Sequence, residues 1–282
     1  MAAASNLALR FATAAVGVPV ILALVFVAPP WAFYLLVLAA ALVGEQELLA
    51  MSHPGDRVSQ GVGVLVAAAA SVAIYLAPAD ARVLVTVLVA VPLFAPLFTL
   101  ARLGSIETAA IRVFALGFGP LFIAVPLTLL GLMRVTLGDA GSGFVILSLG
   151  LAWFADTGAY FAGRFLGRHK LYEAVSPKKT VEGAVGGLVA SIVWALFGSF
   201  VYLRGALPVS HAVPLAIVAG ALGQAGDLGE SLLKRSTGVK DSGAIVPGHG
   251  GILDRVDALI VTSTVVYLYG LWFAAPLASL AR

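Results

Sequence analysis

Residues 21–44 read ILALVFVAPPWAFYLLVLAAALVG, a run without a charged side chain. A helix that spans a lipid bilayer needs about 20 apolar residues. Pro29 and Pro30 interrupt the run, and neither proline can donate a helix hydrogen bond. The stretch therefore predicts two membrane-spanning helices with a break between them.

The composition of the whole chain agrees with this interpretation. Of the 282 residues, 61% are hydrophobic and 11% are charged, and the mean hydropathy is +1.04. Soluble domains carry about 25% charged residues, and membrane barrels show short alternating segments instead of long apolar runs. The net charge is only +3, so the pI near 9.3 does not indicate a nucleic-acid partner. The chain has no cysteine, which excludes disulfides and thiolate metal sites.

The hydropathy pattern predicts an all-α, polytopic transmembrane protein with about nine spans, forming a single membrane domain over residues 1–282. We expect the first span to be retained rather than cleaved as a signal peptide, because one Arg precedes it and further apolar runs follow at once. The predicted spans are 11–28, 31–50, 61–77, 83–101, 110–133, 143–163, 183–203, 211–232 and 256–277.

The Lys and Arg residues predict the orientation of these spans. With the N-terminus in the cytoplasm, most of the 17 Lys and Arg residues fall on the cytoplasmic side. The exceptions are Arg82, Arg134, Arg204 and Arg282. Because cytoplasmic loops carry an excess of positive charge, we expect loops 164–182 and 233–255 to face the cytoplasm. This distribution predicts an integral protein of a bacterial-type inner membrane.

Charged groups are concentrated in the second half of the chain. We therefore expect residues 1–150 to pack, dimerise or shape a cavity, and residues 151–282 to form the catalytic half. Glu45 and Glu47, at the end of the second span, are interpreted as markers of the membrane interface. If Glu45 is buried, it is expected to support a site indirectly.

The most informative segment is GDLGESLLKRSTGVKDSGAIVPGHGGILDRVD, residues 226–257. It predicts a polar helical stripe of Asp227, Glu230, Ser231 and Lys234, then a glycine-rich loop, then Asp254 and Asp257 on one face of the last helix. Two carboxylates brought together at a membrane edge suit a hard divalent cation, Mg²⁺ above all. A charged group inside a span is a functional candidate by default, which applies to Asp227. The alternative for the loop charges is a solvated cytoplasmic surface.

A second polar segment covers residues 156–183. Asp156, Tyr160, Gly163 and Arg164 make another helical stripe, and SPKKTVEG follows at 176–183. Its adjacent lysines and hydroxyls suit an anionic phosphate chain, and Ser176 before Pro177 predicts a helix N-cap. The alternative is a positively charged membrane anchor. The candidate side chains of SPKKTVEG are Ser176, Lys178, Lys179, Thr180 and Glu182.

These residues carry a resemblance to a known family. SLLKRSTGVKDSGAIVPGHGGILDRVD (231–257), SPKKTVEG and DTGAYFAGR (156–164) resemble the phosphatidate cytidylyltransferases, also called CDP-diacylglycerol synthases. The resemblance implies an integral membrane enzyme of about nine helices, able to form a homodimer. Its partners would be CTP, phosphatidic acid and membrane lipids, and its products CDP-diacylglycerol and pyrophosphate. It also implies Mg²⁺, which K⁺ can accompany, and Asp227 and Asp254 match the family's metal-binding aspartates.

The implied chemistry assigns expected roles to the polar residues. The lipid phosphate is already anionic, so catalysis needs in-line positioning and charge neutralisation more than a strong base. The expected catalytic residues are Asp227, Asp254, Lys234 and His249, with His249 donating to the leaving pyrophosphate. Lys178, Lys179, Lys234 and Arg255 are expected to contact the CTP phosphates. The remaining expected substrate-binding residues are Asp156, Arg164, Ser176, Thr180, Glu182 and Ser231.

Two alternatives stay open at this stage. One is a different CTP-dependent lipid-phosphate transferase or a lipid kinase. The other is a secondary transporter, which would place its ionisable groups near the bilayer midplane on broken helices, often in two matching halves. The concentration of polar groups at one face and in one half argues against transport.

Overall fold

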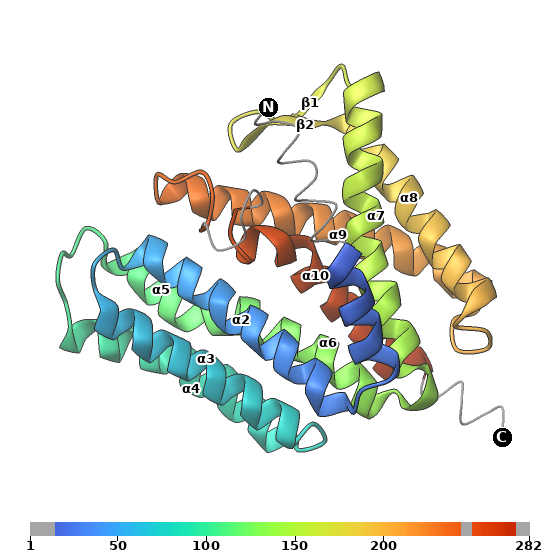
Figure 1. Cartoon of the computed structure of the whole chain (residues 1–282). Coiled ribbons are helices and arrows are strands. Elements are labelled where there is room, and N and C mark those ends of the chain that lie inside the picture. Colours follow the sequence, from blue (N-terminus) through green and yellow to red (C-terminus); the bar gives the residue numbers. More distant parts are fainter. Residues whose placement is uncertain (1–14, 244–249, 275–282) are drawn as a thin grey trace.

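The computed structural model describes residues 15–243 and 250–274, and the regular secondary structure of these residues is helical apart from one short hairpin (Figure 1). Eight helical segments of this part are long and apolar enough to cross a membrane, and a shorter apolar helix, Ala15–Phe26, precedes them. The prediction of an all-α polytopic membrane protein is confirmed. The described elements are α2 (Pro30–Ser52), α3 (Arg57–Leu76), α4 (Ala81–Ala101), α5 (Ala109–Gly119), the π-helical turn η1 (Pro120–Ala124), α6 (Val125–Thr136), η2 (Gly138–Ala140), α7 (Gly141–Leu166), β1 (Lys170–Tyr172), β2 (Ser176–Thr180), α8 (Val181–Val201), α9 (Val209–Ser236), α10 (Leu253–Tyr269) and η3 (Gly270–Ala274).

Prolines mark one helix start and one irregular turn within a span. α2 begins at Pro30, directly after Pro29, as the sequence predicts. Pro120 does not end its span: α5, η1 and α6 continue as one apolar segment over Ala109–Thr136. A proline cannot donate to the helix ladder, and a short π-helical turn accommodates this irregularity.

The helices form two groups on either side of α9 and α10. In Figure 1, α2 to α6 lie together on one side, and α7 pairs with α8 on the other. α10 packs against α2, α6, α7 and α9, so it lies at the centre of the bundle. Asp254 lies in the first turn of this central helix, and Asp257 follows about one turn later. The start of α10 therefore lies where elements from both halves of the chain meet.

α7 and α8 approach each other through glycine. A Cβ atom added at Gly158 of α7 would lie 2.6 Å from the carbonyl oxygen of Gly186 in α8. One added at Gly183 would lie 2.9 Å from the carbonyl oxygen of Ala159. Small residues allow helix backbones in membranes to pack this closely. The β1–β2 hairpin joins this pair and pairs Lys170 with Thr180 in antiparallel register.

Candidate active site

Lys234 joins the end of α9 to the start of α10. Its Nζ lies 2.6 Å from Oε2 of Glu230, one turn earlier on the same helix, and 2.5 Å from Oδ1 of Asp254. Glu230 is 1% exposed and Lys234 8% exposed. Charged groups this deeply buried need partners, because removal from water costs several kcal/mol per ion. The predicted stripe on α9 thus forms one side of a buried, three-membered charge cluster.

The second oxygen of Asp254 organises the loop before α10. Oδ2 accepts hydrogen bonds from the backbone N–H groups of Ser242, at 3.0 Å, and Gly251, at 2.9 Å, and the Ser242 hydroxyl lies 3.0 Å away. Gly250 adopts φ +79°, and a Cβ there would lie 2.8 Å from Oδ2. Only glycine adopts this backbone conformation readily and leaves room for the carboxylate. Gly250 therefore allows the loop backbone to lie directly against the carboxylate of Asp254.

Glu47, from the first half of the chain, holds the same loop. Its carboxylate accepts hydrogen bonds from the N–H groups of Ile252 (3.0 Å) and Leu253 (2.8 Å) and from the Ser242 hydroxyl (2.9 Å). A carboxylate at a helix N-terminus satisfies free N–H groups and favours the helix dipole. Glu47 is 4% exposed and Glu45 is 0% exposed, so both acids are buried within the protein. Both oxygens of Glu45 lack a hydrogen-bond partner within the described residues.

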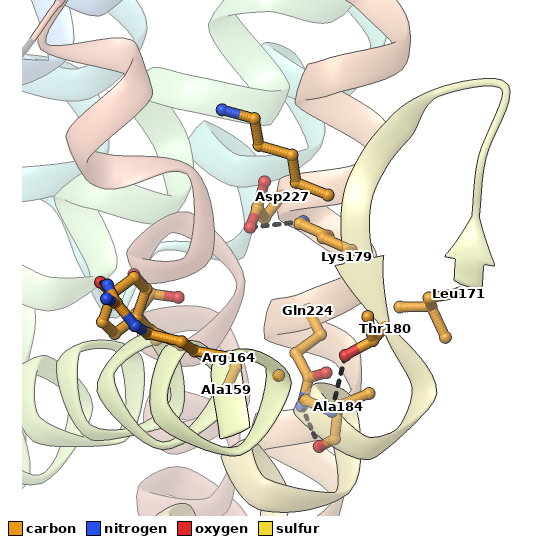
Figure 2. Close-up of a pocket in the computed structure, with 13 residues that line it drawn as sticks. Ala159, Arg164, Leu171, Lys179, Thr180, Ala184, Gln224 and Asp227 are labelled. Carbon is orange, nitrogen blue, oxygen red and sulfur yellow. Dashed lines mark hydrogen bonds and ion pairs between the residues drawn. The ribbon is translucent and has the colours of Figure 1, made fainter. Parts of the chain in front are cut away.

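A cavity of 340 Å³ opens between the end of α7, the hairpin and α9 (Figure 2). Asp156 and Arg164 of α7 line it together with Lys178, Lys179 and Thr180 of β2. Asp227 and Gln224 contribute from α9. The structure thus brings together residues from the two polar segments that the sequence analysis singled out.

An ion pair crosses this cavity. The Nζ of Lys179 lies 2.5 Å from Oδ2 of Asp227, and Figure 2 shows the two side chains pointing toward each other. Lys178 also lines the cavity and is exposed. Arg164 is exposed, and its Nη1 donates a 2.7 Å hydrogen bond to the Tyr160 hydroxyl. The cavity therefore offers several cationic groups at the end of a membrane helix pair.

The start of α8 differs from the sequence prediction. Ser176 begins strand β2, so its assignment as a helix N-cap is wrong. Thr180 caps α8 instead, because its Oγ1 accepts the N–H of Gly183 at 3.1 Å. Glu182 accepts hydrogen bonds from the N–H groups of Arg168, at 3.0 Å, and His169, at 3.2 Å. Glu182 therefore joins the end of α7 to the start of α8.

Carboxylates connect the cavity to the Lys234 cluster. The negative charge of Asp227 is repelled by those of Asp156 and Asp257. Glu230 is repelled in the same way by Asp227 and Asp254. Such oxygen donors suit Mg²⁺, and their mutual repulsion favours a bound cation. Within the described ranges, however, no three such ligands converge on one point. Lysine ammonium groups neutralise Asp227 and Asp254 in this arrangement.

The remaining predicted site residues lie on α9, on α10 or outside the described residues. Ser231 is buried on α9, and Arg255 is exposed on the first turn of α10. His249 lies outside the described residues. Glu47 and Gln224 were missed as candidates, although Glu47 showed the same signal as Asp227, a charged group within an apolar run. Gln224 donates a 3.1 Å hydrogen bond to the Ala184 carbonyl and so ties α9 to α8 beneath the cavity.

Comparison with known proteins places this geometry in context. A family model described as the cytidylyltransferase family matches residues 8–273. A phosphatidate cytidylyltransferase of Brucella suis is 43% identical over 142 residues, 49% of this chain and 52% of the relative. Proteins of that name from Staphylococcus saprophyticus and a Synechocystis strain are each 44% identical, over 120 and 124 residues. Those matches cover 43% and 44% of this chain, and 46% and 42% of the relatives. The chain thus spans about half the length of the curated relatives it matches.

Proposed function

The chain belongs to the cytidylyltransferase family, and on that premise we propose that it transfers a cytidylyl group from CTP to phosphatidic acid. The products are CDP-diacylglycerol and pyrophosphate. The main support for the proposal is the cavity at the end of membrane-spanning helices, which Lys178 lines and in which Lys179 pairs with Asp227. This arrangement offers charge to a polyphosphate in the water phase while a lipid remains among the helices.

The reaction exchanges one phosphoanhydride bond for another. An anionic oxygen of the lipid phosphate attacks the α-phosphorus of CTP, and the bond from that phosphorus to the oxygen shared with the β-phosphate breaks. The electron pair leaves with pyrophosphate. The attacking oxygen carries no proton, so the demands on the protein are alignment of the two oxygens and neutralisation of charge.

The chain's own residues meet these demands in two places. Lys178 and Lys179 line the cavity and would bind the phosphates of CTP. Lys234, from its cluster with Glu230 and Asp254, would contact the leaving pyrophosphate. Asp227 and Asp254 would hold Mg²⁺, which supplies charge neutralisation and orientation of the phosphates when it is bound. Lys179 and Lys234 would then leave their carboxylate partners for phosphate oxygens. The ion pairs of Lys179 with Asp227 and of Lys234 with Asp254 thus provide internal counter-ions that Mg²⁺ and phosphate oxygens would replace.

The proposal includes the location of the site. The positive charge of loops 164–182 and 233–255 supports a cytoplasmic orientation in a bacterial inner membrane. Cytoplasmic CTP would reach the cavity directly from water. The lipid phosphate would approach from the adjacent leaflet, so both reactants meet at the membrane edge.

The decisive experiment follows the fate of the CTP phosphates. Purified full-length chain in detergent is incubated with CTP labelled in the cytidine ring, Mg²⁺ and either phosphatidic acid, diacylglycerol or a polyprenol. The proposal expects pyrophosphate release and labelled lipid with phosphatidic acid alone. A CTP-dependent lipid kinase would instead release labelled CDP and leave the lipid unlabelled. Absence of both products, or equal labelling of all acceptors, would contradict the proposed reaction.

A further inference from the structure

A second polar cavity lies at the ends of α2 and α4 and the start of α5. It has a volume of 550 Å³ and shares no lining residue with the cavity around Asp227. Its charged and titratable lining residues are His53, Asp56, Arg102 and Arg112. Hydroxyl groups are contributed by Ser52, Ser105 and Thr108. Nothing in the proposed transfer reaction requires this cavity.

Arg112 is the central feature of this cavity, and it is 8% exposed. Its guanidinium donates to the carbonyl oxygens of Arg102 (3.2 Å), Leu103 and Ser105 (2.6 Å). Its buried Nε has no hydrogen-bond partner, and none of the ion pairs in the described part of the chain includes Arg112. A buried cation without a counter-ion is costly, so the electrostatics of this site favour an anion.

The other charged groups of the cavity do not neutralise the positive charge of Arg112. Arg102 pairs with Asp56 at 3.1 Å. Hydrogen bonds from Ser59 lower the pKa of Asp56 to about 2, so Asp56 is ionised at neutral pH and offsets Arg102. Burial and the nearby Arg112 lower the pKa of His53, which is therefore neutral. The four groups that face the cavity carry one net positive charge.

The cavity lies at the end of a candidate membrane-spanning helix, α4, where Ala101 and Leu103 line it. Leu93, Leu97 and Leu100 are spaced so that they share one helix face, and they are 60%, 67% and 67% exposed. Arg102 follows at the C-cap of the same helix. A lipid whose phosphate binds at Arg102 and Arg112 would therefore place its acyl chains beside the end of this membrane-spanning helix. Basic pockets between membrane helices on the cytoplasmic side bind anionic lipid head groups.

We infer that this cavity binds the phosphate of an anionic phospholipid, at a site separate from the proposed transfer reaction. The head group contacts Arg102, Arg112 and the cavity hydroxyls, and one acyl chain lies against Leu103, just after α4. A free phosphate would satisfy the same charge but would lack an acyl chain to place against Leu103.

The test measures lipid retained by delipidated, full-length protein in neutral detergent, using native mass spectrometry. Phosphatidylglycerol is the probe because it is not the proposed substrate, phosphatidylcholine is the neutral comparison, and inorganic phosphate is the competitor. The wild type should bind one phosphatidylglycerol at least about fivefold more tightly than phosphatidylcholine, from roughly 1 kcal/mol per basic residue near a membrane surface. Millimolar phosphate should not displace it.

Two variants of opposite charge effect sharpen this test. Arg102→Gln removes a positive charge and should weaken phosphatidylglycerol retention by about fivefold. Asp56→Asn keeps a side chain able to cap α3, removes the neighbouring negative charge, and should strengthen retention by a similar factor. Equal retention of both lipids, or no response to either variant, would overturn the inference. Displacement by inorganic phosphate would reassign the cavity to a soluble anion and also overturn the lipid site.

Discussion

The Ser242 hydroxyl donates a 2.9 Å hydrogen bond to Oε2 of Glu47, which links the loop before α10 to a helix of the first half. Glu47 also accepts the N–H groups of Ile252 and Leu253 at the start of α10. Asp254 lies one residue further along the same turn. The position of a proposed metal ligand therefore depends on an acid far away in the sequence.

Replacement of Glu47 by Gln should lower kcat by on the order of tenfold, the lower end of what loss of a supporting contact to a metal ligand costs. Gln retains the size of the side chain but loses the charge that faces the N-terminus of α10. The KM for CTP should change little, because the cavity residues are unaltered. Steady-state kinetics of purified protein measure both quantities.

Glu45→Gln is the matched control for this experiment. Glu45 lies on the same helix and is fully buried, but its carboxylate has no hydrogen-bond partner among the described residues. Its replacement should leave kcat within about twofold, because no contact to the loop is lost. Equal losses in the two variants would mean that Glu47 acts only through the packing of α2.

Asp227→Asn and Asp254→Asn should each abolish turnover while the protein still inserts and purifies. Each change removes a negative charge that we expect to hold Mg²⁺. Asp241→Asn is the control, since Asp241 is exposed in the nearby loop. Calorimetric titration with Mg²⁺ and CTP gives a readout besides activity, and it should show weaker metal binding in the first two variants only. Near-normal rates in both would remove the metal assignment.

Lys179→Ala should raise the KM for CTP by about tenfold or more, from the roughly 1.5–3 kcal/mol of a charge-assisted hydrogen bond. Lys178→Ala should act in the same direction, and the double variant should lose more than either. Of the two lysines, Lys179 is the one that pairs with Asp227 in the described structure. Its removal should therefore also change the electrostatic environment of that carboxylate. Kinetics at several Mg²⁺ concentrations should therefore separate the two lysines. Unchanged CTP kinetics in the double variant would leave SPKKT as a membrane anchor only.

Single cysteines at Lys170 and Lys240 should be labelled only from the cytoplasmic side. Both positions are exposed, and the chain has no native cysteine to interfere. The physical reason is the excess of Lys and Arg in these loops. Membrane-impermeant maleimide applied to spheroplasts and to inverted vesicles provides the comparison. Labelling of spheroplasts would place the cavity away from cytoplasmic CTP and contradict the proposed orientation.

The sequence predicted the spans and both polar helix stripes because these patterns are local. The break at Pro29 and Pro30, and the i, i+4 pairing of Glu230 with Lys234, follow directly from helix geometry. Strand β2 was not anticipated, since a five-residue strand that contains Pro177 and two lysines has no distinctive hydropathy pattern. A capping residue was expected at Ser176, but the same chemistry is provided by Thr180.

The contacts of Glu47 and the second cavity could not be predicted in the same way. Glu47 meets residues 242, 252 and 253 only after α10 has packed against α2. Arg112 is one of many basic residues near a membrane edge until the carbonyl groups at the end of α4 surround it. Tertiary packing determines both environments, and local sequence patterns do not predict tertiary packing.

The backbone contact between Gly158 and Gly186 has a consequence for how the shape of the cavity can evolve in this protein. Asp156 on α7 and Lys179 before α8 both line the cavity, and only glycine and alanine residues lie between the two helices at their crossing. A mutation there cannot narrow or widen the cavity gradually, because any added carbon meets backbone atoms. Inherited changes in the shape of the cavity should therefore fall on lining residues away from this crossing.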